Sequence, residues 1–441
     1  MKKAILILIA FTSLMVSCNT RSTTGHDTSE NMEGRADGQS EGIPQETDMP
    51  NLPENMNTDS EIMNKMIYEL NDFSLGFYKK LSAEQQNENI SYSPASLNMA
   101  MAIVYSGARE QTRQQMSKVF GFSYEPDVFH PHYHTYFSQV SKLSQDTLLD
   151  FNLANRVFLE QTYQVRDSYL NDVIQWHAGA FEKVDFRNNP GQTEEIINEW
   201  VENITRNRIQ DIIPRGLLTD LTRLVLVNAL YIKSDWRYPF EKEQTVKKMF
   251  TNSRGTETEK DFMTQRLERI KWYEQDDFIA MELPYKSPDL SLLLIRPNEE
   301  VVSDISQYIP DAELYRKIID ELSAETVIME IPPFKIESQF ALVDKLKEAG
   351  LVVAFDERAD FSGISGQKDL LISDVIQKVF FEIDEKGSEA AAATAVVVVT
   401  TSMPVEPPGY EPKKFIADRP FIFILKENKF NTPLFVGQFV Q

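Results

Sequence analysis

The sequence is poor in the residues on which most metal and enzymatic chemistry depends. Its 441 residues include one cysteine and five histidines. A single thiol cannot form a disulfide within the chain, so no internal cross-link can support the fold. His-Glu-x-x-His, Cys-x-x-Cys, phosphate-loop and Gly-x-Gly-x-x-Gly motifs are all missing. The sequence therefore excludes the enzyme classes that these motifs mark, and we expect no metal, no cofactor and no catalytic residues.

Basic residues are also in deficit. Lys and Arg number 45 against 67 Asp and Glu, which gives a net charge of −22. Sequence-independent binding of nucleic acid needs clustered Lys and Arg, which displace counterions from the phosphates. The charge balance therefore argues against a nucleic-acid partner.

The one candidate for membrane contact is the N-terminus. Two lysines precede an apolar run over Ala4–Phe11, which is shorter than the roughly 20 residues that a membrane-spanning helix needs. This pattern predicts an export signal over residues 1–17. Leu14–Cys18 resembles the lipobox of bacterial lipoproteins, which implies lipidation of Cys18. The alternative is an ordinary secretory signal with an incidental cysteine.

Residues 18–60 predict a tether between the signal and the folded domain. From residue 19 on, this segment has nine acids, two arginines and almost no large apolar side chains. It cannot bury enough surface to offset its ordering entropy, so we expect disorder. A lipidated Cys18 would then anchor an exported protein to a membrane, in the periplasm or at the cell surface, or the protein would be released.

Residues 61–441 predict one large α+β domain. Helical periodicity begins near Glu61, continues over Leu97–Val104 and returns over Ile196–Ile204. The second half is rich in short β-branched or aromatic runs that predict strands. These runs are Leu224–Ile232, Leu290–Ile295, Val327–Ile331, Lys378–Ile383, Phe421–Leu425 and Leu434–Val440. Helices should thus be concentrated in the first half of the domain and strands in the second.

Two weak motifs need an interpretation. Gly363–Gly366 approaches a nucleophile elbow, but Gln367 stands where the second glycine should fall and no strand leads into the motif. His130, His132 and His134 could present three imidazoles from an extended segment. The proline between the first two favours instead a surface helix that begins there. We expect His177 to be a surface or packing residue.

One segment contrasts with the rest of the chain. Ala390–Val405 carries no charge, although a quarter of the residues in the protein are charged. A plain buried strand would explain the run. A permanently exposed loop of this composition would be prone to aggregation.

The order of motifs in residues 61–441 resembles that of the serpin family. The matching segments are "NISYSPASL" (89–97), "NEWVENITRNRIQDII" (198–213), "VNALYIKSDWRYPFE" (227–241), "MELPY" (281–285), "IPPFKIES" (331–338), "LKEAGLVVAFDERADFSGIS" (346–365), "ADRPFIFIL" (417–425) and "PLFVGQF" (433–439). The resemblance implies a serpin fold, with helices around a large sheet A, sheets B and C, and an exposed reactive-centre loop at about 385–412.

The resemblance also implies site residues. The hinge would comprise Glu385, Gly387, Ser388, Glu389, Ala390, Ala391, Ala392 and Ala393. The shutter beneath the sheet would comprise Ser93, Ser96, Asn228 and Gln377, with Trp236 at the breach. Gln377 stands where the family usually has histidine. The hinge has only permissive residues, which favours an active inhibitor.

The activity implied is suicide inhibition of a protease. The target forms an acyl-enzyme with the loop, and loop insertion into the sheet then distorts the enzyme. Counting from the hinge places the scissile bond at Thr401-Ser402, with Val399, Thr400 and Met403 as alternatives. These residues favour elastase-like or subtilisin-like targets, and papain-like cysteine proteases are an alternative. A non-inhibitory serpin that proteases cut as a substrate is the other alternative. We expect a monomer.

Overall fold

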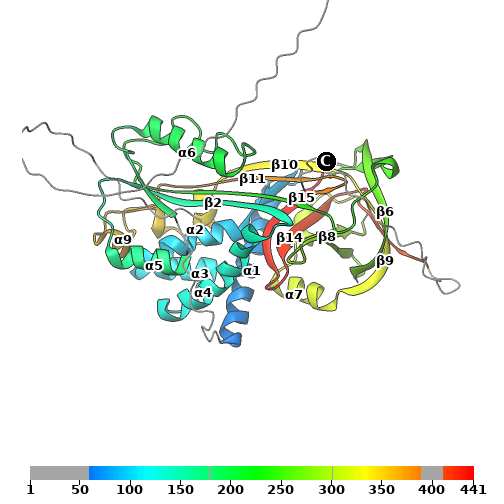
Figure 1. The fold of residues 1–441 in the computed structure, drawn as a ribbon, viewed down its shortest axis with the longest axis horizontal. Coiled ribbons are helices and arrows are strands. Elements are labelled where there is room, and N and C mark those ends of the chain that lie inside the picture. The colour runs from blue at the N-terminus through cyan, green and yellow to red at the C-terminus, as the bar shows by residue number, and fades with distance from the viewer. Residues whose placement is uncertain (1–58, 178–179, 300, 389–410) are drawn as a thin grey trace, which may run out of the picture. The chain divides into compact units, whose positions relative to one another are not determined.

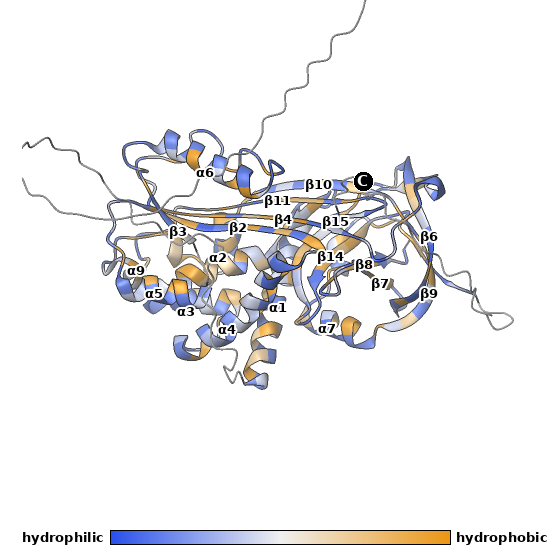
Figure 2. Cartoon of the chain, in the orientation of Figure 1, coloured by the Kyte–Doolittle hydropathy of each residue, from blue (hydrophilic) through white to orange (hydrophobic). Residues whose placement is uncertain are grey.

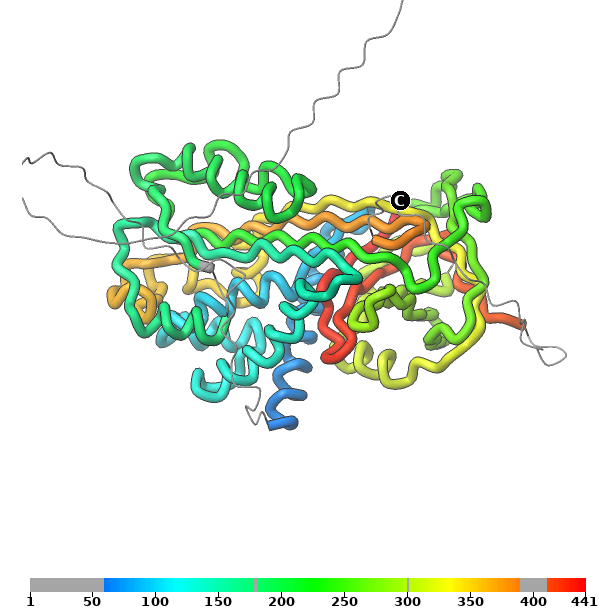
Figure 3. Tube along the Cα trace, in the orientation of Figure 1, coloured from blue at the N-terminus to red at the C-terminus, as the bar shows by residue number. Residues whose placement is uncertain are grey.

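The computed structural model describes residues 59–177, 180–299, 301–388 and 411–441. The described residues all belong to one unit, Gln45–Gln441, and Met1–Pro44 lies outside them. Six helices precede residue 205 and most strands follow residue 224, as the sequence predicts (Figures 1 and 3).

The helices have the following bounds. The α-helices are α1 (Ser60–Glu84), α2 (Pro94–Gly107), α3 (Glu110–Phe120), α4 (Pro126–Ser141), α5 (Asp167–His177), α6 (Pro190–Ile204), α7 (Ala312–Glu321), α8 (Val343–Glu348) and α9 (Ser362–Ser365). The 3₁₀ turns are η1 (Lys142–Gln145), η2 (Lys242–Gln244), η3 (Ile305–Tyr308) and η4 (Val353–Phe355). None of the described helices has the length and apolar character needed to cross a membrane.

The six-stranded sheet has the order β10-β11-β4-β2-β3, with β12 paired to β4. Its strands are β2 (Leu149–Glu160), β3 (Ala180–Val184), β4 (Leu224–Asp235), β10 (Phe334–Ala341), β11 (Asp374–Ile383) and β12 (Gly387–Ser388). The central strands β4 and β11 are parallel to each other, whereas each is antiparallel to its other long neighbour.

The nine-stranded sheet has the order β1-β15-β14-β8-β7-β6-β9-β13, with β5 paired to β6. Its strands are β1 (Ile90–Tyr92), β5 (Val246–Thr251), β6 (Glu257–Glu274), β7 (Phe278–Pro284), β8 (Leu290–Pro297), β9 (Ser323–Ile331), β13 (Lys413–Ile416), β14 (Phe421–Glu427) and β15 (Thr432–Phe439).

Both faces of the six-stranded sheet are covered. Helix α6 lies over one face, and α1 to α5 lie on the other side (Figure 1). Alternate residues of β4 point to opposite faces, so Val225 and Val227 pack under α6 while Leu224 and Leu226 join the larger core. The strand is therefore apolar from Leu224 to Ile232 apart from Asn228, and Figure 2 shows the apolar character of the sheet.

Helix α2 is the most deeply placed helix. All its residues from Pro94 to Gly107 are buried, because the helix contacts both sheets. A buried helix is apolar on every side, which explains why α2 is apolar apart from Ser96, Asn98 and Ser106. Its position brings its N-terminal serines beneath the six-stranded sheet.

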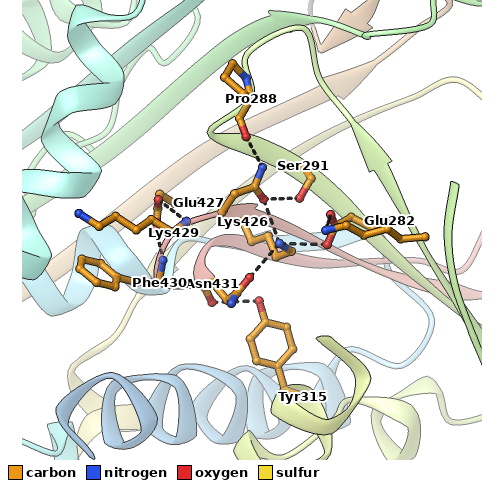
Figure 4. A network of polar contacts seen from close by, with 11 residues as sticks. Glu282, Pro288, Ser291, Tyr315, Lys426, Glu427, Lys429, Phe430 and Asn431 are labelled. Carbon is orange, nitrogen blue, oxygen red and sulfur yellow. Dashed lines mark hydrogen bonds and ion pairs between the residues drawn. The ribbon is translucent and has the colours of Figure 1, made fainter. Parts of the chain in front are cut away.

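A buried polar network fixes the turn between β14 and β15 (Figure 4). Nζ of Lys426 is 3.0 Å from a carboxylate oxygen of Glu282 and donates to Asn431 Oδ1 at 3.0 Å. Burial would raise the pKa of Glu282, but the nearby lysines hold it below its usual value. The Glu427 carboxylate accepts from the backbone N–H groups of Lys429 and Phe430 at 2.6 and 2.9 Å. These contacts supply charged and backbone groups with the partners that burial requires.

Candidate functional site

The centre of the site is the seam between β4 and β11. The two strands pair directly from Val225 to Leu230 on β4 and from Asp374 to Val379 on β11. Their pairing stops there, although both strands continue for several residues. The seam is thus closed over its first part and parted at its far end.

The described part of the predicted hinge, Glu385–Ser388, lies at the parted end of the seam. The chain reverses after β11 in a turn in which Asp384 N donates to Gly387 O at 2.8 Å. Strand β12 then pairs antiparallel with β4, with Gly387 opposite Asp235 and Ser388 opposite Ser234. A segment that continued β12 along β4 would run antiparallel to both seam strands.

Close packing constrains both residues of β12. A Cβ added to Gly387 would lie 2.0 Å from the Ser234 carbonyl oxygen, so only glycine allows this approach. The Ser388 side chain is 1% exposed, and its Oγ lies 2.5 Å from the Tyr285 hydroxyl. Residue 388 therefore occupies a small polar site beside β4, at the parted end of the seam.

Trp236, the predicted breach residue, holds the hinge turn. It stacks on Tyr285 with ring centroids 4.3 Å apart, and its indole N–H donates to the Asp384 carbonyl at 2.8 Å. Its backbone N–H donates to the Lys386 carbonyl at 2.7 Å. Glu385 also contacts this region, because its carboxylate accepts from the Thr245 hydroxyl at 3.0 Å. The hinge turn is thus tied to the segment that follows β4.

The predicted shutter residues meet under the closed part of the seam. Gln377 Nε2 donates to Asn228 Oδ1 at 2.7 Å and to the Ser93 carbonyl at 2.8 Å. Ser93 N–H in turn donates to Gln377 Oε1 at 3.0 Å, and Ser93 Oγ donates to the Leu434 carbonyl at 2.8 Å. Gln377 and Asn228 are register partners on β11 and β4. Their side-chain bond therefore joins the two strands across the seam.

Ser96 joins this network through its backbone carbonyl and not through its hydroxyl. Its hydroxyl is buried and forms no hydrogen bond with the described residues. Its carbonyl accepts from Asn155 Nδ2 at 3.2 Å, and Asn228 Nδ2 donates to Asn155 Oδ1 at 3.4 Å. Asn155 of β2 thus belongs to the network. Sequence reasoning missed Asn155, as it missed Tyr285 and Thr245, because an isolated polar residue in or after a strand carries no local signal.

Several predicted site residues lie outside the described residues. They are Cys18, Glu389, Ala390, Ala391, Ala392, Ala393, Val399, Thr400, Thr401, Ser402 and Met403. Their assignments stay predictions.

The histidine segment is not a surface helix that starts at its proline. Helix α4 begins at Pro126 and carries Pro131 in its interior, and His130 and His132 are buried. The prediction was wrong because the side chains of α4 pack against α5 as well as facing solvent. His177 is fully buried, with Nε2 2.9 Å from Ser106 Oγ. No group of three possible metal ligands occurs among the described residues.

The buried histidines predict acid sensitivity. Burial, with a smaller effect of Arg113, lowers the pKa of His130 to about 4, and burial lowers that of His177. Below about pH 6.5, the usual pKa of histidine, these residues bind protons in the unfolded chain but not in the folded one. The free energy of unfolding therefore decreases as the pH is lowered. His130 alone should cost about 3 kcal/mol between roughly pH 6.5 and 4.

Urea denaturation at several pH values would measure this loss. The variant His130→Phe should lose less stability on acidification than the wild type, because it removes one titrating group from an aromatic cluster. Lys118→Gln, an exposed change on α3, serves as the control. Equal acid dependence in His130→Phe and the wild type would contradict the assignment.

Gly363–Gly366 is not a nucleophile elbow. Its first three residues fall in the one-turn helix α9, and no strand leads into it. Gly363 packs directly against the carbonyl of Gly107, where a Cβ would come within 2.5 Å of the oxygen. The motif is a close helix contact.

Comparisons with known proteins agree with this architecture. The family model "Serpin (serine protease inhibitor)" matches residues 68–441. Serpin B3 of Homo sapiens is 32% identical over 403 residues, which cover 87% of this chain and 99% of that protein. Antithrombin-III of Mus musculus is 33% identical over 395 residues, which cover 86% and 83%. The native-state structure of the thermophilic serpin Tengpin matches with a TM-score of 0.76 and 26% identity, over 88% and 96% of the two chains.

The protein therefore belongs to the serpin family. Its fold is the α+β serpin fold, in which the six-stranded sheet is sheet A. This family is one of protease inhibitors in general, and its members are mostly inhibitors or binding proteins rather than enzymes.

Proposed function

We propose that this protein inhibits serine proteases by suicide-substrate trapping. The observation that carries the proposal is the parted seam, where Gly387 and Ser388 already pair with β4 at the end of a parallel strand pair. A loop that continued from Ser388 and inserted between β4 and β11 would replace their parallel pairing by two antiparallel pairings, which are slightly more stable per residue. The chain contributes a cleavable bond and an inserting strand, with no catalytic residues of its own.

The register of β12 supports this proposal. Continued along β4, it would place Ala390 opposite Ile232, Thr394 opposite Asn228 and Val397 opposite Val225. Both faces of the sheet are covered there, so an inserted charge would lack a partner and cost several kcal/mol. The lack of charge from Ala390 onward fits this requirement. Thr394, which carries the one hydroxyl between Ala390 and Val397, would reach the shutter, where it can hydrogen-bond.

The loop sequence supports a choice of targets. We propose cleavage at Thr401-Ser402, with Val399, Thr400 and Met403 as the neighbouring alternatives. Small or apolar residues at all these positions suit elastase-like or subtilisin-like serine proteases. Papain-like cysteine proteases are the second class to be tested.

Incubation with an elastase-like protease tests the mechanism. We expect a covalent complex that survives denaturing electrophoresis, because the trapped acyl-enzyme is not hydrolysed. Mass spectrometry of the released C-terminal peptide should identify the cleaved bond. A protease whose catalytic serine is replaced by alanine is the control and should form no complex. Cleavage without any complex would contradict inhibition and support a non-inhibitory serpin.

We also propose that the protein is exported and lipidated at Cys18. The supporting observations are the two lysines, the short apolar run and the lipobox-like Leu14–Cys18. The lipid would attach the monomeric serpin domain to a membrane surface. Expression with a radiolabelled fatty acid should label the wild type and not Cys18→Ser. Equal absence of label in both would contradict lipidation.

A further inference from the structure

A pocket among helices α2 to α5 has no part in the proposed trapping mechanism. These helices lie side by side across the sheet from α6 (Figure 1). The pocket has a volume of about 380 Å³, which is within the range of small-molecule sites. Its lining includes charged residues of both signs and a tryptophan.

Two arginines provide its positive side. Arg109 precedes α3, and its Nη1 donates to the carbonyls of Ser106 and Ala108 at 3.0 and 2.7 Å, which fixes the guanidinium. The Arg113 guanidinium lies over the Tyr105 ring, 5.5 Å from its centroid. Within the described part of the chain, neither guanidinium is ion-paired with a carboxylate. Burial and the nearby charges of Arg113 and Arg166 lower the pKa of Arg109, while the charges of Asp360 and Asp172 oppose that effect.

Two aspartates provide the negative side. Asp127 lies in the first turn of α4, and Asp172 lies on α5. Neither carboxylate accepts a hydrogen bond from the residues that the structure describes. Burial raises the pKa of Asp172, and the charge of Arg109 opposes that effect. The pocket thus presents two charges of each sign with no ion pair among these four described residues, although Arg109 and Asp172 influence one another electrostatically.

An aromatic wall and a buried histidine complete the pocket. The ring of His130 stacks on Trp176 with centroids 6.5 Å apart and an interplanar angle of 14°. His130 is 6% exposed, and its Nδ1 has no hydrogen-bond partner among the described residues. The stacked rings of His130 and Trp176 thus form an aromatic side of the pocket, next to the charged residues.

We propose that the pocket binds a small aromatic zwitterion, such as a free aromatic amino acid. The carboxylate would pair with Arg109 and Arg113, the ammonium with Asp127 and Asp172, and the ring would contact Trp176. Guanidinium groups match carboxylates in geometry as well as charge. A simple anion would be repelled by the aspartates, and a simple cation by the arginines. Only a molecule with both charges satisfies both sides.

Isothermal titration calorimetry with three probes that share one ring tests this. L-phenylalanine carries both charges, phenylacetate only the negative one, and phenethylamine only the positive one. For a ligand of this size we expect a Kd on the order of 1 mM for phenylalanine. The other two probes should bind at least about tenfold more weakly, because each loses a charge-assisted contact.

Variants of the full chain locate the site. Arg113→Gln and Asp172→Asn should each raise the Kd for phenylalanine by about tenfold, whereas Arg113→Lys should raise it less. Lys118→Gln, on the same helix but outside the pocket, should leave the Kd unchanged. The melting temperature of each variant without ligand shows whether it is folded. Equal binding of phenylacetate, no binding of phenylalanine, or wild-type affinity in folded Arg113→Gln and Asp172→Asn would each overturn the proposal.

Discussion

Replacing Ser388 by arginine should convert the inhibitor into a substrate. Ser388 is buried against Tyr285 at the entry to the seam, where the site has room for a hydroxyl and no partner for a charge. Placing an unpaired guanidinium there costs several kcal/mol. A barrier raised by about 3 kcal/mol slows insertion by about a hundredfold. The acyl-enzyme would then be hydrolysed before the loop inserts.

Titration of protease activity and denaturing electrophoresis measure this effect. For Ser388→Arg we expect loss of the covalent complex, a large rise in the number of inhibitor molecules used per protease, and normal cleavage of the loop. Ser388→Thr retains the hydroxyl and serves as the matched control, with complex formation near that of the wild type. A full yield of complex from Ser388→Arg would show that trapping does not depend on a small residue at position 388 beside β4.

Replacing Gln377 by leucine should destabilise the closed sheet. The change leaves Ser93 N–H and Asn228 Oδ1, both buried, without the partner that Gln377 supplies. The Ser93 carbonyl loses one of two donors and still accepts from Leu97 N–H at 3.3 Å. Each unsatisfied group costs about 1–3 kcal/mol, so the free energy of unfolding should fall by about 3–5 kcal/mol. Because the lost bond to Asn228 crosses the seam, β4 and β11 should also part more readily.

Urea denaturation followed by tryptophan fluorescence measures the loss of stability, and size-exclusion chromatography after mild heating detects self-association. Gln339→Leu is the matched control, since Gln339 is exposed on β10 and donates a single hydrogen bond to the Ile212 carbonyl. We expect it to cost about 1 kcal/mol or less. If Gln377→Leu were no more destabilising than Gln339→Leu, the seam bond would not hold the sheet closed.

Secondary structure was predicted well where periodicity was strong. The apolar run over Leu97–Val104 and the strand over Leu224–Ile232 both lie within elements of the expected type. In each case neighbouring elements cover the faces of the helix or strand, so the covered positions are occupied by apolar residues and the sequence shows the pattern. Pro131 shows where this reasoning failed. Within a helix, proline is favoured at the first turn, as Pro126 is here, but α4 also carries Pro131 in its interior.

The polar contacts of the site were predicted only in part. The resemblance identified Ser93, Asn228, Gln377 and Trp236. In the structure Gln377 bonds to both Ser93 and Asn228, and Trp236 bonds to the hinge turn. The resemblance did not identify Asn155 or Tyr285, which lie far from their partners in sequence. Hydrogen bonds between such distant residues depend on strand register and on how layers pack. A linear pattern carries no record of either.

The sequence by itself determined the family, the division into helical and strand-rich halves and the uncharged run after the hinge, because each is a property of residue type and order. Only the tertiary structure decided that β4 and β11 are parallel neighbours, that they part beyond Leu230 and Val379, and that Ser388 occupies the opening. The physical reason is that pairing between strands is a long-range choice. Which strands pair depends on which faces are buried and on which hydrogen-bond ladders form, and both exist only once the chain has folded.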